Sequence, residues 1–266
     1  MISDITFGQY FPGQSFLHKV DPRIKILLTI AQIILTFVAS TYMSLITVVL
    51  QTLLVILLSG INIGLYIKNL KIIMFVVIFT ALLNLFYGVG EPIFSFLIFK
   101  ITEDSIKNSI FVSTRIICLI FISSSLTFTT LPSDLANAIE LLMRPLKLLK
   151  VPVHEIAMMM TIALRFIPTL LEETNKIIMA QKARGADFDS SGKLIKKIKA
   201  FAPILILLFI SSFRRAYDLA VAMECRCYRG AKGRTRMRKL KVGSIDIVAI
   251  LFIFFYSSLL IVFNNT

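Results

Sequence analysis

Two arginines in this sequence have similar neighbours and could bind the same kind of partner. The two segments read Ala183-Arg184-Gly185 and Cys225-Arg226-Cys227, and in each an alanine stands four positions before the arginine. A guanidinium between small residues can reach into a groove and form paired hydrogen bonds with a carboxylate, which lysine cannot reproduce. A single basic residue near a helix C-terminus could instead merely stabilise the helix dipole. Because the pattern occurs twice, we favour docking to an acidic protein partner.

Other groups of reactive residues do not have the spacing that their chemistry requires. Gly185 and Gly192 have six residues between them, whereas a phosphate-binding loop has four. His154-Glu155 lacks the second histidine of a zinc-protease helix, and Cys225-x-Cys227 has no companion pair. We therefore predict no catalytic residue, no metal site and no cofactor.

The composition indicates that membrane helices position the two arginines. Of the 266 residues 57% are hydrophobic and 17% are charged, and the mean hydropathy is +0.84. Such a chain is too apolar to form the surface of a soluble globular protein. The 29 Lys and Arg against 15 Asp and Glu are typical of loops that face anionic lipid or acidic partners. We expect contact with the lipid bilayer and none with nucleic acid.

Uncharged runs long enough to cross a bilayer occur along most of the chain. Positions 26–67 carry no formal charge and could hold two spans joined by a turn at residues 39–44. A third run lies between Lys71 and Glu91, a fourth follows Arg115, and a fifth follows Asp246. We therefore predict an all-α membrane protein with about five transmembrane helices.

The distribution of charge predicts the orientation. Lys68 and Lys71 follow the second span, whereas the turn after the first span is uncharged. Residues 131–242 carry 21 Lys and Arg but 9 Asp and Glu, so the positive-inside rule places this block and the N-terminus in the cytoplasm. The predicted organisation is a membrane domain with four spans (1–130), a cytoplasmic coupling domain (131–242) and a fifth span (243–266) with its tail outside.

Prolines and glycines divide the basic block into about three amphipathic helices. We place them near residues 133–149, 152–184 and 192–230, with bends at Pro168 and Pro203. The first helix and the far half of the second have apolar residues at helical spacing on one side and charged residues on the other. The third begins with a basic turn and continues through an apolar middle. Arg184 and Arg226 would then lie near the ends of the second and third helices.

Three further residues are predicted to brace the structure. Asp21 before Pro22 suits the N-cap of the first span, and Arg23 follows it. Arg165 lies in an apolar stretch and needs a carboxylate or carbonyl partner, or must extend to an interface. The spans otherwise contain almost no acid or base, which argues against a proton-driven carrier and against an intramembrane enzyme.

Several short motifs together resemble one known family. They are Gly8-x-Tyr10-x-Pro12-Gly13-x-Ser15, His18-x-x-Asp21-Pro22-Arg23, Ala163-Leu164-Arg165-Phe166-Ile167-Pro168, Ala180-Gln181-x-Ala183-Arg184-Gly185 and Ala222-Met223-Glu224-x-Arg226. With these residues the chain resembles the T component, the transmembrane coupling protein, of prokaryotic energy-coupling factor transporters.

The resemblance implies a non-catalytic subunit in the cell membrane. It would join two ABC-type ATPases to a small substrate-binding membrane protein, the S component, for vitamin or micronutrient uptake. In that family two Ala-Arg-Gly motifs dock into grooves of the ATPases. Ala183-Arg184-Gly185 matches directly, whereas the second motif departs as Cys225-Arg226-Cys227, and Arg229-Gly230 is the alternative second contact. A secondary transporter or channel with a cytoplasmic helical domain is the alternative function.

Overall fold

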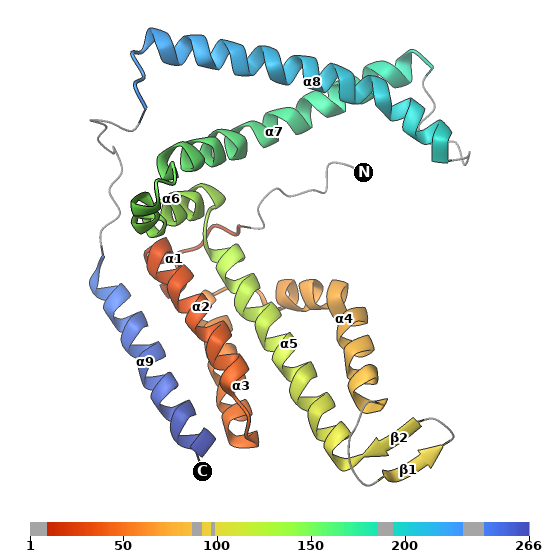
Figure 1. Ribbon diagram of the computed structural model, residues 1–266, viewed down its shortest axis with the longest axis vertical. Coiled ribbons are helices and arrows are strands. Elements are labelled where there is room, and N and C mark those ends of the chain that lie inside the picture. Colours follow the sequence, from red (N-terminus) through yellow and green to blue (C-terminus); the bar gives the residue numbers. More distant parts are fainter. Residues whose placement is uncertain (1–9, 87–91, 97–98, 186–193, 231–241, 266) are drawn as a thin grey trace. The chain divides into compact units, whose positions relative to one another are not determined.

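The computed structural model describes residues 10–86, 92–96, 99–185, 194–230 and 242–265 (Figure 1). The chain divides into two compact units. One, here called the bundle, comprises residues 8–138 and 239–266, and the other, here called the arm unit, includes residues 139–238. Each unit is described by itself below.

The bundle consists of long apolar helices. They are α1 (Phe16–Lys19), α2 (Pro22–Val38), α3 (Tyr42–Ser59), α4 (Ile63–Phe86), α5 (Glu103–Thr129) and α9 (Ser244–Asn265). Helices α2, α3, α5 and α9 lie side by side, and α4 packs against α5 (Figure 1). Many large side chains on the outside are apolar and exposed, including Phe75 at 78% and Phe254 at 73%. A helix satisfies its own backbone hydrogen bonds, so such a surface is compatible with lipid.

A short β-hairpin between α4 and α5 is an addition to the predicted fold. Strands β1 (Pro92–Phe96) and β2 (Phe99–Thr102) pair antiparallel, with Phe96 opposite Phe99. Helix α5 follows at once, and its N-cap Thr102 accepts a hydrogen bond from the Ser105 backbone at 3.2 Å. The hairpin does not alter the class of the fold, which is an all-α membrane protein as predicted.

Five described helices are long and apolar enough to cross a membrane. They are α3, α4, α5, α9 and, in the arm unit, α7 (Val153–Ala183). Helix α2, which corresponds to the first predicted span, has 17 residues and is one residue shorter than α3, the shortest of these five. The number of candidate spans agrees with the prediction, but their identity differs at α2 and α7.

Two predicted span boundaries were wrong. Arg115 was expected at the start of the fourth span, yet α5 begins twelve residues earlier, at Glu103. Lys68 and Lys71 were expected in a loop, yet α4 begins at Ile63 and includes both. Charged residues do not end a helix when their side chains find partners or reach solvent, so the uncharged runs underestimated helix length.

Buried polar contacts join three helix ends at one end of the bundle. The Asp21 backbone N–H donates to Asp246 Oδ1 at 2.7 Å, which joins the starts of α2 and α9. Lys25 Nζ donates to the Thr129 carbonyl oxygen at 3.2 Å, which joins the start of α2 to the end of α5. The end of α5 and the starts of α2 and α9 therefore lie at the same end of the bundle.

A second set of contacts closes the opposite end. The Ser40 hydroxyl in the α2–α3 turn donates to Asn264 Oδ1 near the end of α9, at 2.5 Å. Arg115 donates from Nε to the Thr36 carbonyl at 3.2 Å and from a terminal nitrogen to the Ala39 carbonyl at 2.9 Å. These carbonyls lie at the C-terminus of α2, where a cation is favourable.

The arm unit is built mainly from two long helices. Helix α6 (Pro132–Leu142) begins in the bundle and is followed by a 3₁₀ helix (Arg144–Leu149), by α7 and by α8 (Leu194–Cys225). The first predicted amphipathic helix thus ends at Leu142 instead of continuing to Leu149. Pro145 has no backbone N–H to donate and cannot extend α6, so the chain tightens into a 3₁₀ turn.

Candidate functional site

The first predicted docking end is the C-terminus of α7. Arg184 is the C-cap residue, and its backbone N–H donates to the Gln181 carbonyl at 3.1 Å. Gly185 has φ +85° and donates to the Lys182 carbonyl at 3.0 Å. The glycine thus ends the helix in a left-handed conformation that costs it little. The Arg184 side chain is exposed directly at the helix end.

The second predicted docking end has the same construction. Arg226 is exposed and follows the last residue of α8, Cys225. Cys227 has φ +56° and donates to the Glu224 carbonyl at 2.8 Å, which repeats the Gly185 contact. The Tyr228 N–H completes the motif by donating to the Met223 carbonyl at 3.1 Å. The two arginines therefore occupy equivalent positions, each just before a left-handed residue.

The alternative second contact lies in a different setting. Arg229 is also exposed and precedes Gly230, which has φ +73°. It lies four residues beyond the last residue of α8, so it does not share the helix-end position of Arg184 and Arg226. The local geometry favours Arg226 as the counterpart of Arg184.

Cys227, which has a left-handed backbone conformation, provides a test of the geometry at the end of α8. A non-glycine residue at positive φ costs roughly 1–2 kcal/mol, so Cys227→Gly should strengthen the end of α8 and Cys227→Val should weaken it. The matched control is Cys225, whose backbone is helical, and there a change to glycine should weaken the helix by about 1 kcal/mol. Hydrogen exchange of the amides of residues 223–228 measures both effects. Equal responses at the two positions would contradict the assigned geometry.

Helices α7 and α8 cross and are held together by a charged contact (Figure 1). Glu173 of α7 accepts hydrogen bonds from the hydroxyl of Ser211 and from the guanidinium of Arg215, both on α8. Ser211 and Arg215 are four residues apart and therefore lie on one side of α8. Glu173 and Arg215 are 42 positions apart, so local spacing in the sequence gives no sign of this pairing.

Two of the three predicted braces make the contacts that their roles require. Asp21 is 6% exposed and accepts from the Arg23 backbone N–H at 2.9 Å as the N-cap of α2. The Arg23 guanidinium returns to the same carboxylate, with a nitrogen–oxygen distance of 3.2 Å. Arg165 is exposed, and no ion pair or hydrogen bond of its guanidinium is found within the described residues. Its role as a brace stays a prediction without a contact.

Lys25 is a buried cation that sequence reasoning did not select. It is 5% exposed, and Nζ donates to Thr129 Oγ1 at 3.3 Å and to Thr130 Oγ1 at 2.9 Å in addition to the Thr129 carbonyl. An amine in such a place must be paired, because burying an unpaired charge is costly. Its position at the edge of an apolar run was the available signal.

The N-terminal motif forms a strap across the ends of bundle helices. The Phe11 N–H donates to the Phe128 carbonyl at 2.9 Å, and the two rings meet edge to face. His18 donates from Nε2 to the Phe11 carbonyl at 2.9 Å, so its Nδ1 accepts from the Ser15 hydroxyl at 2.6 Å. A Cβ on Gly13 would come within 2.8 Å of the His18 ring. These motif residues therefore have a structural role in the bundle.

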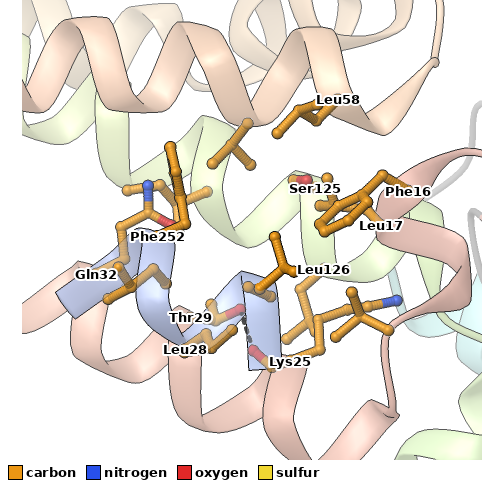
Figure 2. Close-up of a pocket in the computed structure, with 16 residues that line it drawn as sticks. Phe16, Leu17, Lys25, Leu28, Thr29, Gln32, Leu58, Ser125, Leu126 and Phe252 are labelled. Atoms are coloured by element: carbon orange, nitrogen blue, oxygen red, sulfur yellow. Dashed lines mark hydrogen bonds between the residues drawn. The ribbon is translucent and has the colours of Figure 1, made fainter. Parts of the chain in front are cut away.

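An apolar cavity of about 250 Å³ lies inside the bundle (Figure 2). Its walls come from α1, α2, α3, α5 and α9, and Phe16, Leu58 and Phe252 are among the lining residues. Two lining polar atoms, Gln32 Nε2 and Ser125 Oγ, are buried without a hydrogen-bond partner. Each such atom lowers the stability of the bundle.

Removing the unpaired Gln32 amide should stabilise the bundle. Gln32→Leu is expected to raise the free energy of unfolding by about 1–3 kcal/mol, measured as a higher midpoint of thermal unfolding in detergent. Gln51→Leu is the matched control, because Gln51 Nε2 is also buried and unpaired but does not line the cavity. If Gln32→Leu destabilises while Gln51→Leu stabilises, the cavity holds a partner for Gln32 and the assignment is wrong.

Comparison with known proteins identifies the family. Residues 13–237 match the family described as CbiQ, cobalt transport protein. A protein of Ruminiclostridium cellulolyticum named energy-coupling factor transporter transmembrane protein EcfT is 52% identical over 248 residues, covering 93% of this chain and 92% of the relative. The chain belongs to the CbiQ family.

Further relatives with the same name are similar over nearly the whole chain. The relative from Clostridium kluyveri is 49% identical over 251 residues, 94% of this chain and 93% of its own length. The relative from Lactococcus lactis is 44% identical over 265 residues, 99% of both. The predicted resemblance is confirmed, and with the apolar helices it identifies a multi-pass membrane protein of a transport system.

In the described part of this CbiQ family member, no three His, Cys, Asp or Glu side chains are grouped so that they could hold a metal ion. Two features stand out in the arm unit. One is the pair of equivalent helix ends that carry Arg184 and Arg226, and the other is the contact at Glu173, where α7 and α8 cross. Exposed guanidiniums at helix ends are suited to protein recognition through carboxylates.

Proposed function

We propose that the chain is the transmembrane coupling subunit of an energy-coupling factor importer. It would join two ABC-type ATPases to a substrate-binding S component and carry the effect of ATP binding and hydrolysis to that component during vitamin or micronutrient uptake. The observation that carries this proposal is the repeated helix end, with Arg184 and Arg226 both exposed just before a left-handed residue. The names of the relatives support the same role.

Each arginine would dock into an acidic groove of one ATPase. Arg184 with Ala183 and Gly185 forms the first contact, and Arg226 between Cys225 and Cys227 forms the second. The small flanking residues allow close approach, and the planar guanidinium can form two hydrogen bonds with one carboxylate. Catalysis would belong to the ATPases, and the choice of substrate would belong to the S component.

The proposed topology places α2, α3, α4, α5 and α9 in the cell membrane and residues 131–242 in the cytoplasm. Helix α2 is about 26 Å long, near the lower limit for a span, and polar contacts tie it to α9 near both of its ends. Helix α7 is apolar enough to span, but its second half carries Glu172, Glu173 and Lys176. Those charges suit a helix at the cytoplasmic interface better than a span.

Labelling of introduced cysteines tests this orientation. In a variant with the native cysteines replaced, a thiol at Gly192 should react with a membrane-impermeant reagent only after the cells are opened. A thiol at Ser40, in the turn assigned to the outside, is the control and should react in intact cells. If Gly192 is labelled in intact cells, the basic block is not cytoplasmic.

Co-expression with a pair of ABC-type ATPases and an S component from one genome tests the function. The three kinds of partner should co-purify with the chain, and reconstituted vesicles should import substrate only when ATP is supplied. The chain alone should not hydrolyse ATP, because its sequence has no complete phosphate-binding loop. Uptake by the chain alone, driven by an ion gradient, would instead support the secondary transporter.

A further inference from the structure

The crossing of α7 and α8 lies at the same distance from both docking ends. Eleven residues separate Glu173 from Arg184 along α7, and eleven separate Arg215 from Arg226 along α8. At 1.5 Å per residue each arm is about 16 Å long. The contact between Glu173 and Arg215 therefore joins two helical segments of equal length, each ending in a docking arginine.

The contact between Glu173 and α8 restrains the angle at which α7 and α8 cross. Glu173 accepts from the hydroxyl of Ser211 with one carboxylate oxygen and from the guanidinium of Arg215 with the other. The side chains of Glu173 and Arg215 are 21% and 38% exposed, so the pair is partly withdrawn from solvent. Both oxygens of one carboxylate are used, which restrains the rotation of one helix on the other.

We propose that Glu173 is the positioning residue that sets the separation of the two docking ends. This inference rests on the proposed function, in which Arg184 and Arg226 meet two ATPases at once. With arms of about 16 Å, a change of 20° in the crossing angle moves one end relative to the other by roughly 6 Å. If the crossing were loosened, each docking end could still bind its ATPase, but α7 and α8 would no longer move as one rigid body.

Distance measurements in the assembled complex test the joint directly. Spin labels at Gln181 and Glu224, beside the two docking arginines, report the separation of the arm ends after Cys225 and Cys227 are replaced by serine and glycine. The wild-type background should give one narrow distribution of distances. In Glu173→Ala the distribution should broaden, as expected for a freed crossing, although its mean should change by less than the roughly 6 Å swing of one arm, because the two arms point to opposite sides of the crossing (Figure 1). Glu172→Ala is the matched control, because Glu172 is exposed.

Coupling in proteoliposomes provides the second readout. Glu173→Ala should retain both ATPases on purification, yet the amount of substrate imported per ATP hydrolysed should fall on the order of tenfold or more, as for other misplaced functional groups. Glu173→Gln keeps the shape of the side chain and should show an intermediate loss. The double variant Glu173→Arg/Arg215→Glu should restore the narrow distribution and most of the coupling, because it restores the pair in reverse.

The outcomes separate the two hypotheses. If the wild-type chain does not co-purify with ATPases, the proposed function fails whatever the distances show. If it does, but Glu173→Ala leaves both the distance distribution and the import per ATP unchanged, Glu173 is not the joint. If Glu173→Ala and the reversed pair both lose the ATPases, the contact serves only to fold the arm unit, and the positioning role is overturned.

Discussion

Changing both Arg184 and Arg226 to alanine should release the ATPase partners and abolish uptake, while the membrane bundle stays folded. Both side chains are exposed at helix ends in the arm unit, and neither contributes to the core of the bundle. Removing one partner of a desolvated charge pair costs on the order of 2 to 5 kcal/mol. Two such losses would weaken docking by on the order of 4 to 10 kcal/mol, so we expect separation.

Single changes should have graded effects. With one docking end intact, Arg184→Ala or Arg226→Ala should reduce uptake while some complex still assembles. Arg184→Glu should be worse than Arg184→Ala, because it places a negative charge against an acidic groove. The measurements are co-purification of ATPase subunits and substrate uptake for each variant.

Arg229 provides the matched control for the second docking end. It is an exposed arginine close to Arg226, but it lies beyond the helix end, so Arg229→Ala should leave assembly nearly unchanged. If Arg229→Ala loses the ATPase subunits while Arg226→Ala assembles normally, the second contact is made by Arg229 and not by Arg226. Normal assembly and uptake by the Arg184/Arg226 double variant would refute docking through these ends altogether.

Lys25→Met should destabilise the bundle more than any change to an exposed lysine. The substitution leaves the Thr129 carbonyl and the hydroxyls of Thr129 and Thr130 without their donor at a buried site. We expect a loss of about 3 kcal/mol, equivalent to a fall of roughly 10 °C in the midpoint of thermal unfolding. The effect is large because Lys25 joins the start of α2 to the end of α5.

Lys107→Met is the control for this prediction. Lys107 pairs with an acid, Glu103, at 3.2 Å, and both side chains are largely exposed. Exposed pairs of this spacing contribute about 0.3–0.5 kcal/mol, so the midpoint should hardly change. Equal midpoints for Lys25→Met and Lys107→Met would show that Lys25 is not a structural link.

The gross architecture could be predicted from composition and spacing because those signals are local. Long uncharged runs predict helices in lipid, and the predicted all-α membrane class holds. The end of α7 was also predictable, because a glycine such as Gly185 tolerates the left-handed conformation that follows a helix. Helix α8 was expected to continue to Gly230 but ends at Cys225. The exact ends of the spans could not be predicted from charge alone. Arg115 lies within α5 and Lys68 lies within α4, because a single charged residue does not end a helix.

The sequence by itself was enough to select Arg184 and Arg226 as candidate docking groups, but only the tertiary structure decided how the helices that carry them are held. Arg184 and Arg226 could be selected from their neighbours, whereas the Glu173–Arg215 pair joins residues 42 positions apart and has no sequence signature. Lys25 and Thr129 are 104 positions apart, and their contact likewise exists only after α2 and α5 pack together. Helix type and helix ends follow from local hydrogen bonding and polarity, but pairing between helices depends on the packing of the whole unit.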